Sequence, residues 1–256
     1  TSRLKKTIAR LEKRQIVPKR QTTLYLEVFR TGNLFCQNGS PFTFRTKKVA
    51  ELFFFLWHQD QQRATRDEIL EQLWPELDEE RGATLMHSTI YQLRKALQQK
   101  GFEKPIPFEN QNYHLNVPLT SDLGKWEACL NQDPTDEIVQ EALSLYRGHY
   151  FELEAFPWAH FRMEQIKMKW SNYLFSLLDA PLHPQTMERI ILWSRHHKRL
   201  DEKWGIALIN YFGERSEIHQ LVTYYDLLRE AWREELGLDV PQAITDRYNH
   251  FLFPTN

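Results

Sequence analysis

The sequence has few of the residues that build metal, disulfide or phosphate-cradling sites. Its two cysteines, Cys36 and Cys129, lie far apart, which gives no support to a zinc cluster or a disulfide framework and suits a reducing compartment. Only 9 of the 256 residues are glycine, and there is no P-loop, no glycine-rich dinucleotide turn, no G-x-S-x-G and no H-E-x-x-H. We therefore expect no enzyme, no metal site and no cofactor.

Long apolar runs and a strong net charge are also missing. The longest apolar block, 52–57, is far shorter than the roughly 18 residues of a membrane-spanning helix, and no signal peptide opens the chain. The formal net charge of −1 argues against a non-specific binder of polyanions, but it allows a local basic face. We expect a cytoplasmic protein without membrane contact. Because the chain begins with Thr, we also expect a piece of something longer.

The composition, 41% hydrophobic and 26% charged, is typical of a globular protein, and the pattern of apolar and polar residues changes along the chain. Residues 23–44 alternate like strands around an Asn38-Gly39 turn, the strongest short signal for a hairpin. Three helix candidates follow: one capped by Thr46, one over 65–74 with a Thr65/Glu68 capping box, and one over 83–97. Two short strands, 105–109 and 113–117, come next, joined by residues 110–112. From about residue 119 the pattern is helical, with short connections that predict stacked helical hairpins.

The helix predicted over 83–97 has two unlike faces. Met86, Ile90, Leu93 and Leu97 form an apolar stripe at helical spacing. The opposite stripe and its flanks contain hydroxyls, amides, bases and an aromatic ring but no acid: Thr84, His87, Ser88, Tyr91, Gln92, Arg94 and Lys95. Such side chains can contact phosphates or read base edges.

Other interpretations of these residues stay open. The polar stripe could be a solvated helix side, Arg94 could serve an intramolecular ion pair, and Tyr91 could pack against a neighbouring strand. Residues 1–20 carry eight Lys or Arg against one acid, which fits either the last helix of an upstream domain with its linker or an arm that contacts DNA. The adjacent His196 and His197 point to different faces of a helix and do not form a metal pair.

The order of strands, capped helix TRDEILEQLW, acidic loop, helix ending in YQLRKAL and terminal hairpin resembles the winged helix-turn-helix of OmpR-type response regulators. The stretches that follow resemble the bacterial transcriptional activator domain of AfsR/SARP-type regulators: SDLGKWEACL (121–130), LSLYRGHYFEL (143–153), PWAHFRMEQIKMKWSNYLFSLL (157–178) and ELGLDVPQAITDRYNHFL (235–252). The fold class expected is mainly α with a small β part, a winged helix followed by a TPR-like helical domain. The domains expected are a basic helix and linker from a receiver-like domain over 1–22, the winged helix over 23–118 and the activator domain over 119–256.

The resemblance also implies partners and sites. Helix 83–97 would lie in the major groove of double-stranded DNA, with Thr84, His87, Ser88, Tyr91, Arg94 and Lys95 reaching it, while Arg66, Lys47 and Lys48 would hold phosphates. The loop 75–82 would contact RNA polymerase through Glu76, Asp78, Glu79 and Glu80. Relatives commonly bind direct repeats as dimers, so tandem half-sites and a homodimer are expected. The wing departs from many relatives, because its tip is Glu109-Asn110-Gln111-Asn112 rather than Arg and glycines; Asn112 could still touch sugar or phosphate.

Two hypotheses of function result. The first is a sequence-specific DNA-binding regulator of transcription, an activator that contacts polymerase. The second is an interaction protein in which the winged helix and the helical hairpins dock protein partners. The two differ in salt dependence, since six to ten phosphate contacts imply a log–log slope of roughly −5 to −9.

Overall fold

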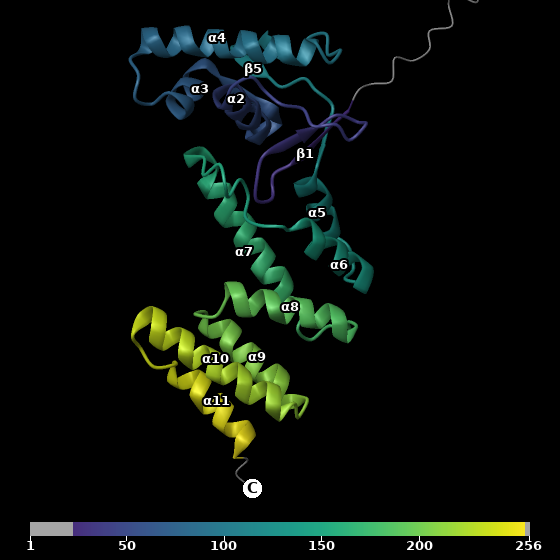
Figure 1. Cartoon of the computed structure of the whole chain (residues 1–256), viewed down its shortest axis with the longest axis vertical. Helices are drawn as coiled ribbons and strands as arrows, with labels where there is room; N and C mark the ends of the chain where they lie inside the picture. Colours follow the sequence, from purple (N-terminus) through teal and green to yellow (C-terminus); the bar gives the residue numbers. More distant parts are fainter. Residues whose placement is uncertain (1–22, 254–256) are drawn as a thin grey trace, which may run out of the picture. The chain divides into compact units, whose positions relative to one another are not determined.

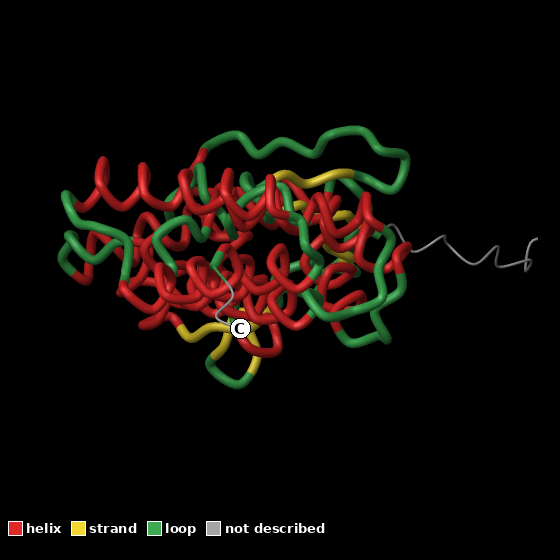
Figure 2. The backbone as a smooth tube through the Cα atoms, turned by 90° about the horizontal axis from the view of Figure 1, so that it is seen from below, coloured by secondary structure: helices red, strands yellow, loops and turns green. Residues whose placement is uncertain are grey.

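The computed structural model describes residues 23–253, so the basic helix and linker expected over 1–22 lie outside the described residues. About 60% of the described residues are helical and the strands among them are few and short, which confirms the predicted class, mainly α with a small β part (Figure 2). The described chain divides into two compact units (Figure 1). Unit 1 comprises residues 23–125 and 148–163, and unit 2 comprises residues 126–147 and 164–253. The units interleave along the chain, whereas the sequence suggested one boundary near residue 118.

A small sheet opens unit 1. Strand β1 (Leu24–Glu27) pairs antiparallel with β2 (Asn33–Phe35) and parallel with β6 (Leu119–Ser121). The predicted turn follows β2: the Cys36 amide donates to the Ser40 carbonyl at 2.8 Å, and Gly39 has φ +78°, a backbone conformation that glycine adopts without strain. Strand β6 was not predicted, because three residues paired with a strand 95 positions away leave no local pattern.

Three helices follow the first sheet. Helix α2 (Lys47–His58) begins after the Thr46 cap, and α3 (Arg66–Leu73) begins after the Thr65/Glu68 capping box; both caps are as predicted. Helix α4 (Glu79–Gln98) packs on α2 and α3 through its apolar stripe. It starts four residues before the predicted 83, because the Asp78 carboxylate accepts the Arg81 amide at 2.9 Å and caps an earlier first turn.

A second sheet of unit 1 forms the wing, with the strand order β3-β5-β4. Its strands are β3 (Arg63–Thr65), β4 (Phe108–Glu109) and β5 (Asn112–His114). Asn110 and Gln111 both have positive φ, 49° and 64°, so β4 and β5 are joined by a two-residue turn whose twist suits a hairpin. The predicted strands 105–109 and 113–117 were therefore too long, and Asn112 lies in a strand rather than in the turn.

Residues 148–163 complete unit 1. The Arg30 amide donates to the His149 carbonyl and the Phe151 amide to the Val28 carbonyl, both at 2.8 Å. The ring of Phe151 then lies 5.2 Å from that of Phe54 in α2. A segment that resembles part of the activator domain thus packs into the core beside α2.

The remaining elements are helices: the short 3-10 helix η2 (Pro157–Ala159), α5 (Asp122–Leu130), α6 (Asp136–Leu145), α7 (His160–Ser176), α8 (Pro184–His197), α9 (Glu202–Glu214), α10 (Ile218–Leu236) and α11 (Gln242–Leu252). In unit 2, α9 packs against α10 and α11, and α6 packs against α8, as expected for stacked hairpins. Gly237, at φ +65°, ends α10 in the left-handed conformation that glycine adopts without strain. Trp170 and Trp204 are fully buried in this unit, and the Trp204 indole donates to the Ser171 hydroxyl at 3.1 Å.

Candidate nucleic-acid interface

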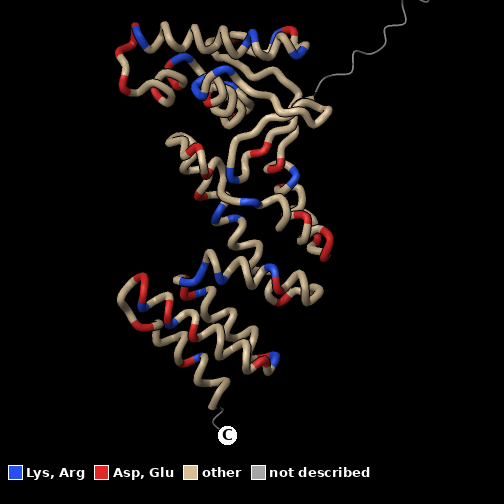
Figure 3. Tube along the Cα trace, viewed as in Figure 1, with Lys and Arg blue, Asp and Glu red and all other residues tan. Residues whose placement is uncertain are grey.

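The polar stripe of α4 is exposed. Thr84, His87, Ser88, Tyr91 and Lys95 all have exposed side chains, and Tyr91 is 65% exposed, so it does not pack against a wing strand. No Lys, Arg, Asp or Glu occurs between Thr84 and Leu93, and this part of α4 carries neither charge colour in Figure 3. The stripe is therefore a solvent-facing surface of hydrogen-bonding groups rather than a mixed ionic face.

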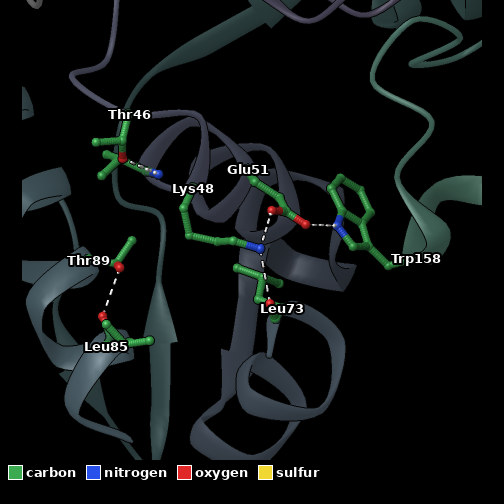
Figure 4. Close-up of polar contacts among 8 residues, drawn as sticks. Thr46, Lys48, Glu51, Leu73, Leu85, Thr89 and Trp158 are labelled. Atoms are coloured by element: carbon green, nitrogen blue, oxygen red, sulfur yellow. Dashed lines mark hydrogen bonds and ion pairs between the residues drawn. The ribbon is translucent and has the colours of Figure 1, made fainter. Parts of the chain in front are cut away.

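The opposite face of α4 fixes the helix in unit 1. Met86, Ile90, Leu93 and Leu97 are at most 2% exposed. Thr89 is also buried, and its hydroxyl donates to the Leu85 carbonyl at 2.8 Å (Figure 4). Burial of four large apolar side chains, at about 1.5–3 kcal/mol each, holds the exposed stripe on a rigid support.

Arg94 is engaged inside unit 1. Its Nε donates to the Ile106 carbonyl at 2.8 Å, and its guanidinium lies 5.9 Å from the centre of the Tyr113 ring. Arg94 therefore has an intramolecular role, but its partners are a backbone carbonyl and an aromatic ring rather than the acid of an ion pair. Arg94 joins α4 to the segment that leads into the wing, and this arrangement speaks against a DNA contact from it.

Lys48 is engaged as well. Its Nζ lies 2.6 Å from a Glu51 oxygen and donates to the Leu73 carbonyl at 3.0 Å, while the other Glu51 oxygen accepts the Trp158 indole N–H at 3.4 Å (Figure 4). The ammonium thus satisfies a carbonyl at the carboxyl end of α3, where a cation is favoured by the helix dipole. Lys47, its neighbour in the sequence, is exposed.

Arg66 forms an exposed ion pair. Its guanidinium lies 3.1 Å from a carboxylate oxygen of Glu79, whose side chain is 80% exposed. A residue expected to hold a phosphate is thereby paired with one expected to contact polymerase. Exposed pairs of this kind contribute about 0–1 kcal/mol, so the pair does not prevent Arg66 from turning to another anion.

The acidic residues lie around the start of α4. Glu76 lies in the turn before it, Asp78 caps the helix, and Glu79 and Glu80 form its first turn. All four are exposed. The loop predicted over 75–82 is therefore shorter than expected, since its last four residues are helical.

At the wing, the structure places the Asn112 side chain against its own turn. The Asn112 amide nitrogen donates to the Asn110 carbonyl at 2.8 Å, and His114 Nε2 lies 3.3 Å from the Glu109 carbonyl. These short-range bonds fix the hairpin tip. The side chain of Phe108, on β4, is 54% exposed, and Leu85 on α4 is 46% exposed. Neither was predicted to belong to the interface, although each is an apolar residue outside the predicted core stripes.

Residues 23–253 contain no cluster of three or more His, Cys, Asp or Glu side chains arranged to hold a metal ion. No helix in this range has the length and apolarity needed to cross a bilayer.

Comparison with known proteins shows a likeness of fold. No protein-family model and no curated protein matches the sequence. Among solved structures, a structure of EmbR from Mycobacterium tuberculosis, in complex with a low-affinity phosphopeptide, superposes with a TM-score of 0.67 at 17% identity. The alignment covers 90% of this chain and 65% of that one. At this identity the likeness extends to the fold alone, and this chain spans less than two thirds of the EmbR chain.

Proposed function

We propose that this protein is a sequence-specific, double-stranded DNA-binding regulator of transcription of the AfsR/SARP type, with α4 as the helix that enters the major groove. The observation that carries the proposal is the exposed, acid-free stripe of α4 on a rigid helical support. A helix fits the major groove of B-DNA, and hydroxyl, imidazole and amide groups can pair with base edges there.

The roles within the stripe follow from the surroundings of each side chain. Thr84, His87, Ser88 and Tyr91 are the candidates for base or sugar contacts, because they are uncharged or weakly basic and exposed. Three more residues are candidates for phosphates: Lys95, Lys47 and, after release from Glu79, Arg66. Arg94 and Lys48 would support the interface from inside unit 1 without touching DNA. Asn112, at the wing, would at most contact the sugar–phosphate backbone.

Selection of bound duplexes from a random DNA library tests this proposal. We expect enrichment of a defined motif, arranged as a direct repeat if the protein binds as a dimer. The selection should be repeated at low and at physiological salt, because the sequence-independent attraction of cations to phosphates weakens as the salt concentration rises. A motif that is still enriched at physiological salt reflects sequence-specific contacts. Recovery of unrelated sequences at both salt concentrations would contradict sequence-specific recognition.

The acidic residues at the start of α4 are proposed to contact RNA polymerase. Four acidic residues before and within the first turn of α4 are exposed, and a DNA-bound α4 would leave them accessible: Glu76, Asp78, Glu79 and Glu80. Replacing Asp78, Glu79 and Glu80 with Ala should lower transcription in a purified system without weakening DNA binding. Because Asp78 caps α4, Glu79→Ala with Glu80→Ala alone serves as the variant that keeps the helix start intact. Transcription at the wild-type level with both variants would contradict the proposed contact of these residues with RNA polymerase.

A second candidate function is a protein-docking module. One observation favours it: Lys48 and Arg94 are engaged internally and Arg66 is paired, so the surface offers fewer cations than the resemblance implies. Exposed Leu85, Tyr91 and Phe108 would then belong to a protein interface. A docking module would show no strong, salt-dependent affinity for any duplex.

A further inference from the structure

Unit 2 contains a groove between α8 and α10, made of two hollows that share the cation Arg195. The hollows have volumes of about 290 and 340 Å³, and Leu192 and Arg195 line both of them. The first is also lined by Tyr224 and Leu227 of α10, and the second by Met187 of α8. We call this feature the α8–α10 groove. The DNA-binding proposal makes no use of it.

Arg195 lies in an apolar setting without an anionic partner. Its guanidinium lies 5.8 Å from the centre of the Phe212 ring and 5.7 Å from that of Tyr224. Within residues 23–253 it forms no ion pair or hydrogen bond, and its buried Nε has no acceptor. A buried donor without a partner costs about 1–3 kcal/mol, more when the group is charged. The arrangement therefore favours a ligand that brings an anionic acceptor to this point.

The surroundings restrict the ligand to a single carboxylate rather than a polyanion. Glutamates occur in both hollows, Glu230 and Glu234 in the first and Glu188 and Glu217 in the second. The first hollow is also lined by His196 and by Arg199, but the Arg199 guanidinium is already paired with Glu235 at 2.7 Å. The glutamates of the two hollows would repel a nucleic acid or a multiply phosphorylated ligand. One carboxylate can still pair with the planar guanidinium in a two-point contact.

The two hollows add an apolar requirement. Leu192, which lines both hollows, is 54% exposed, and Leu227 in the first hollow is 43% exposed. Each hollow has room for one large apolar side chain, and burying such a side chain stabilises a complex by about 25 cal/mol per Å². Two hollows that share one cation suit successive side chains of a peptide better than one compact molecule.

We propose that the α8–α10 groove binds a peptide segment of a partner protein in which one Asp or Glu lies between two large apolar residues. The carboxylate would accept hydrogen bonds from Arg195, and the apolar side chains would fill the two hollows. Unit 2 would thereby recruit a protein partner independently of DNA.

Selection of displayed random 12-residue peptides against the whole chain tests this proposal. We expect enriched peptides with one acidic residue flanked by large apolar residues. The most enriched peptide, synthesised with a fluorescent label, gives a Kd by anisotropy. Replacing its Asp or Glu with the corresponding amide should weaken binding at least tenfold. Failure to enrich any motif, or a motif without a carboxylate, would overturn the proposal.

Variants of the protein locate the peptide. Arg195→Met should weaken binding at least tenfold, and Arg229→Met, an exposed position on α10 that does not line the groove, should leave it unchanged. Should Arg195→Met fail to fold, peptide binding to Leu192→Glu tests the proposal instead. This exposed position tolerates a charge, and the introduced carboxylate would repel the carboxylate of the peptide. Unchanged binding to Leu192→Glu, or equal losses in Arg195→Met and Arg229→Met, would place the peptide elsewhere and contradict the proposal.

Discussion

Two pairs of neighbouring cations, Lys47-Lys48 and Arg94-Lys95, differ within each pair in what they can do. Lys48 and Arg94 are half-buried and donate to backbone carbonyls of other elements, whereas Lys47 and Lys95 are exposed. Successive helix residues are turned by about 100°, so one neighbour faces the protein while the other faces solvent. A basic residue beside a candidate DNA surface is therefore not necessarily a phosphate contact. It can bind a phosphate only if its donors are not already engaged by other groups of the protein.

Two histidines of unit 1 extend this comparison. His87 is exposed on α4, while His58, at the end of α2, is half-buried: its Nδ1 lies 2.9 Å from the Tyr150 hydroxyl and its ring 5.0 Å from that of Trp158. Burial, with a smaller contribution from the positive charge of Arg162, lowers the pKa of His58 from 6.5 to about 4. Unfolding therefore binds a proton between these two pH values.

The largest predicted effect is a loss of stability on acidification through this window. Below pH 6.5 the unfolded chain protonates His58 and the folded chain does not, so the free energy of unfolding falls as the pH drops from 6.5 towards 4, by up to about 3 kcal/mol. Urea unfolding of the wild type and of His58→Gln at pH 7 and pH 4.5 measures it. The variant should lose less stability than the wild type; equal losses would show that His58 is not the group responsible.

The next effect separates Arg94 from Lys95. Arg94→Met removes a charged donor from the Ile106 carbonyl and should lower the free energy of unfolding by about 1.5–3 kcal/mol. Lys95→Met, the matched exposed neighbour, should change it by no more than about 0.5 kcal/mol. Denaturant titration of both variants compares them. Similar values would mean that the Arg94 contacts contribute little to stability.

A smaller difference is expected between Lys48 and Lys47. Lys48→Met leaves Glu51 with only the Trp158 indole and leaves the Leu73 carbonyl without this donor, at a cost of about 1 kcal/mol. Lys47→Met should be neutral within about 0.5 kcal/mol. Thermal unfolding at low and high salt measures both, and the Lys48 effect should shrink with salt because its side chain is 41% exposed.

Much of the secondary structure of unit 1 could be predicted from short-range features of the sequence. The Thr46 cap, the Thr65/Glu68 box, the turn at Gly39 and the apolar stripe of α4 are set within a few residues of the chain, and all are found. The exposure of the polar stripe followed from the same helical periodicity, because the side opposite a buried stripe faces outward.

What could not be predicted depends on distant partners. Arg94 and Lys48 are engaged by the carbonyls of Ile106 and Leu73, 12 and 25 positions away, and backbone carbonyls leave no mark in a sequence. The return of residues 148–163 to unit 1 depends on aromatic contacts that many helical pairings could have offered. The early start of α4 was predictable in principle, since Asp78 is a good helix cap followed by two glutamates.

The central claim is that the exposed stripe of α4 reads DNA. It is tested most directly by the ratio of affinities for the selected duplex and for a scrambled duplex, measured for the wild type and for His87→Ala with Ser88→Ala. Both residues are exposed, so the double variant should fold as the wild type does, which circular dichroism verifies. We predict that the difference in binding free energy that corresponds to this ratio falls by about 1–3 kcal/mol for each base pair that the stripe reads, while affinity for the scrambled duplex changes little. An unchanged ratio would contradict the claim and favour the protein-docking alternative.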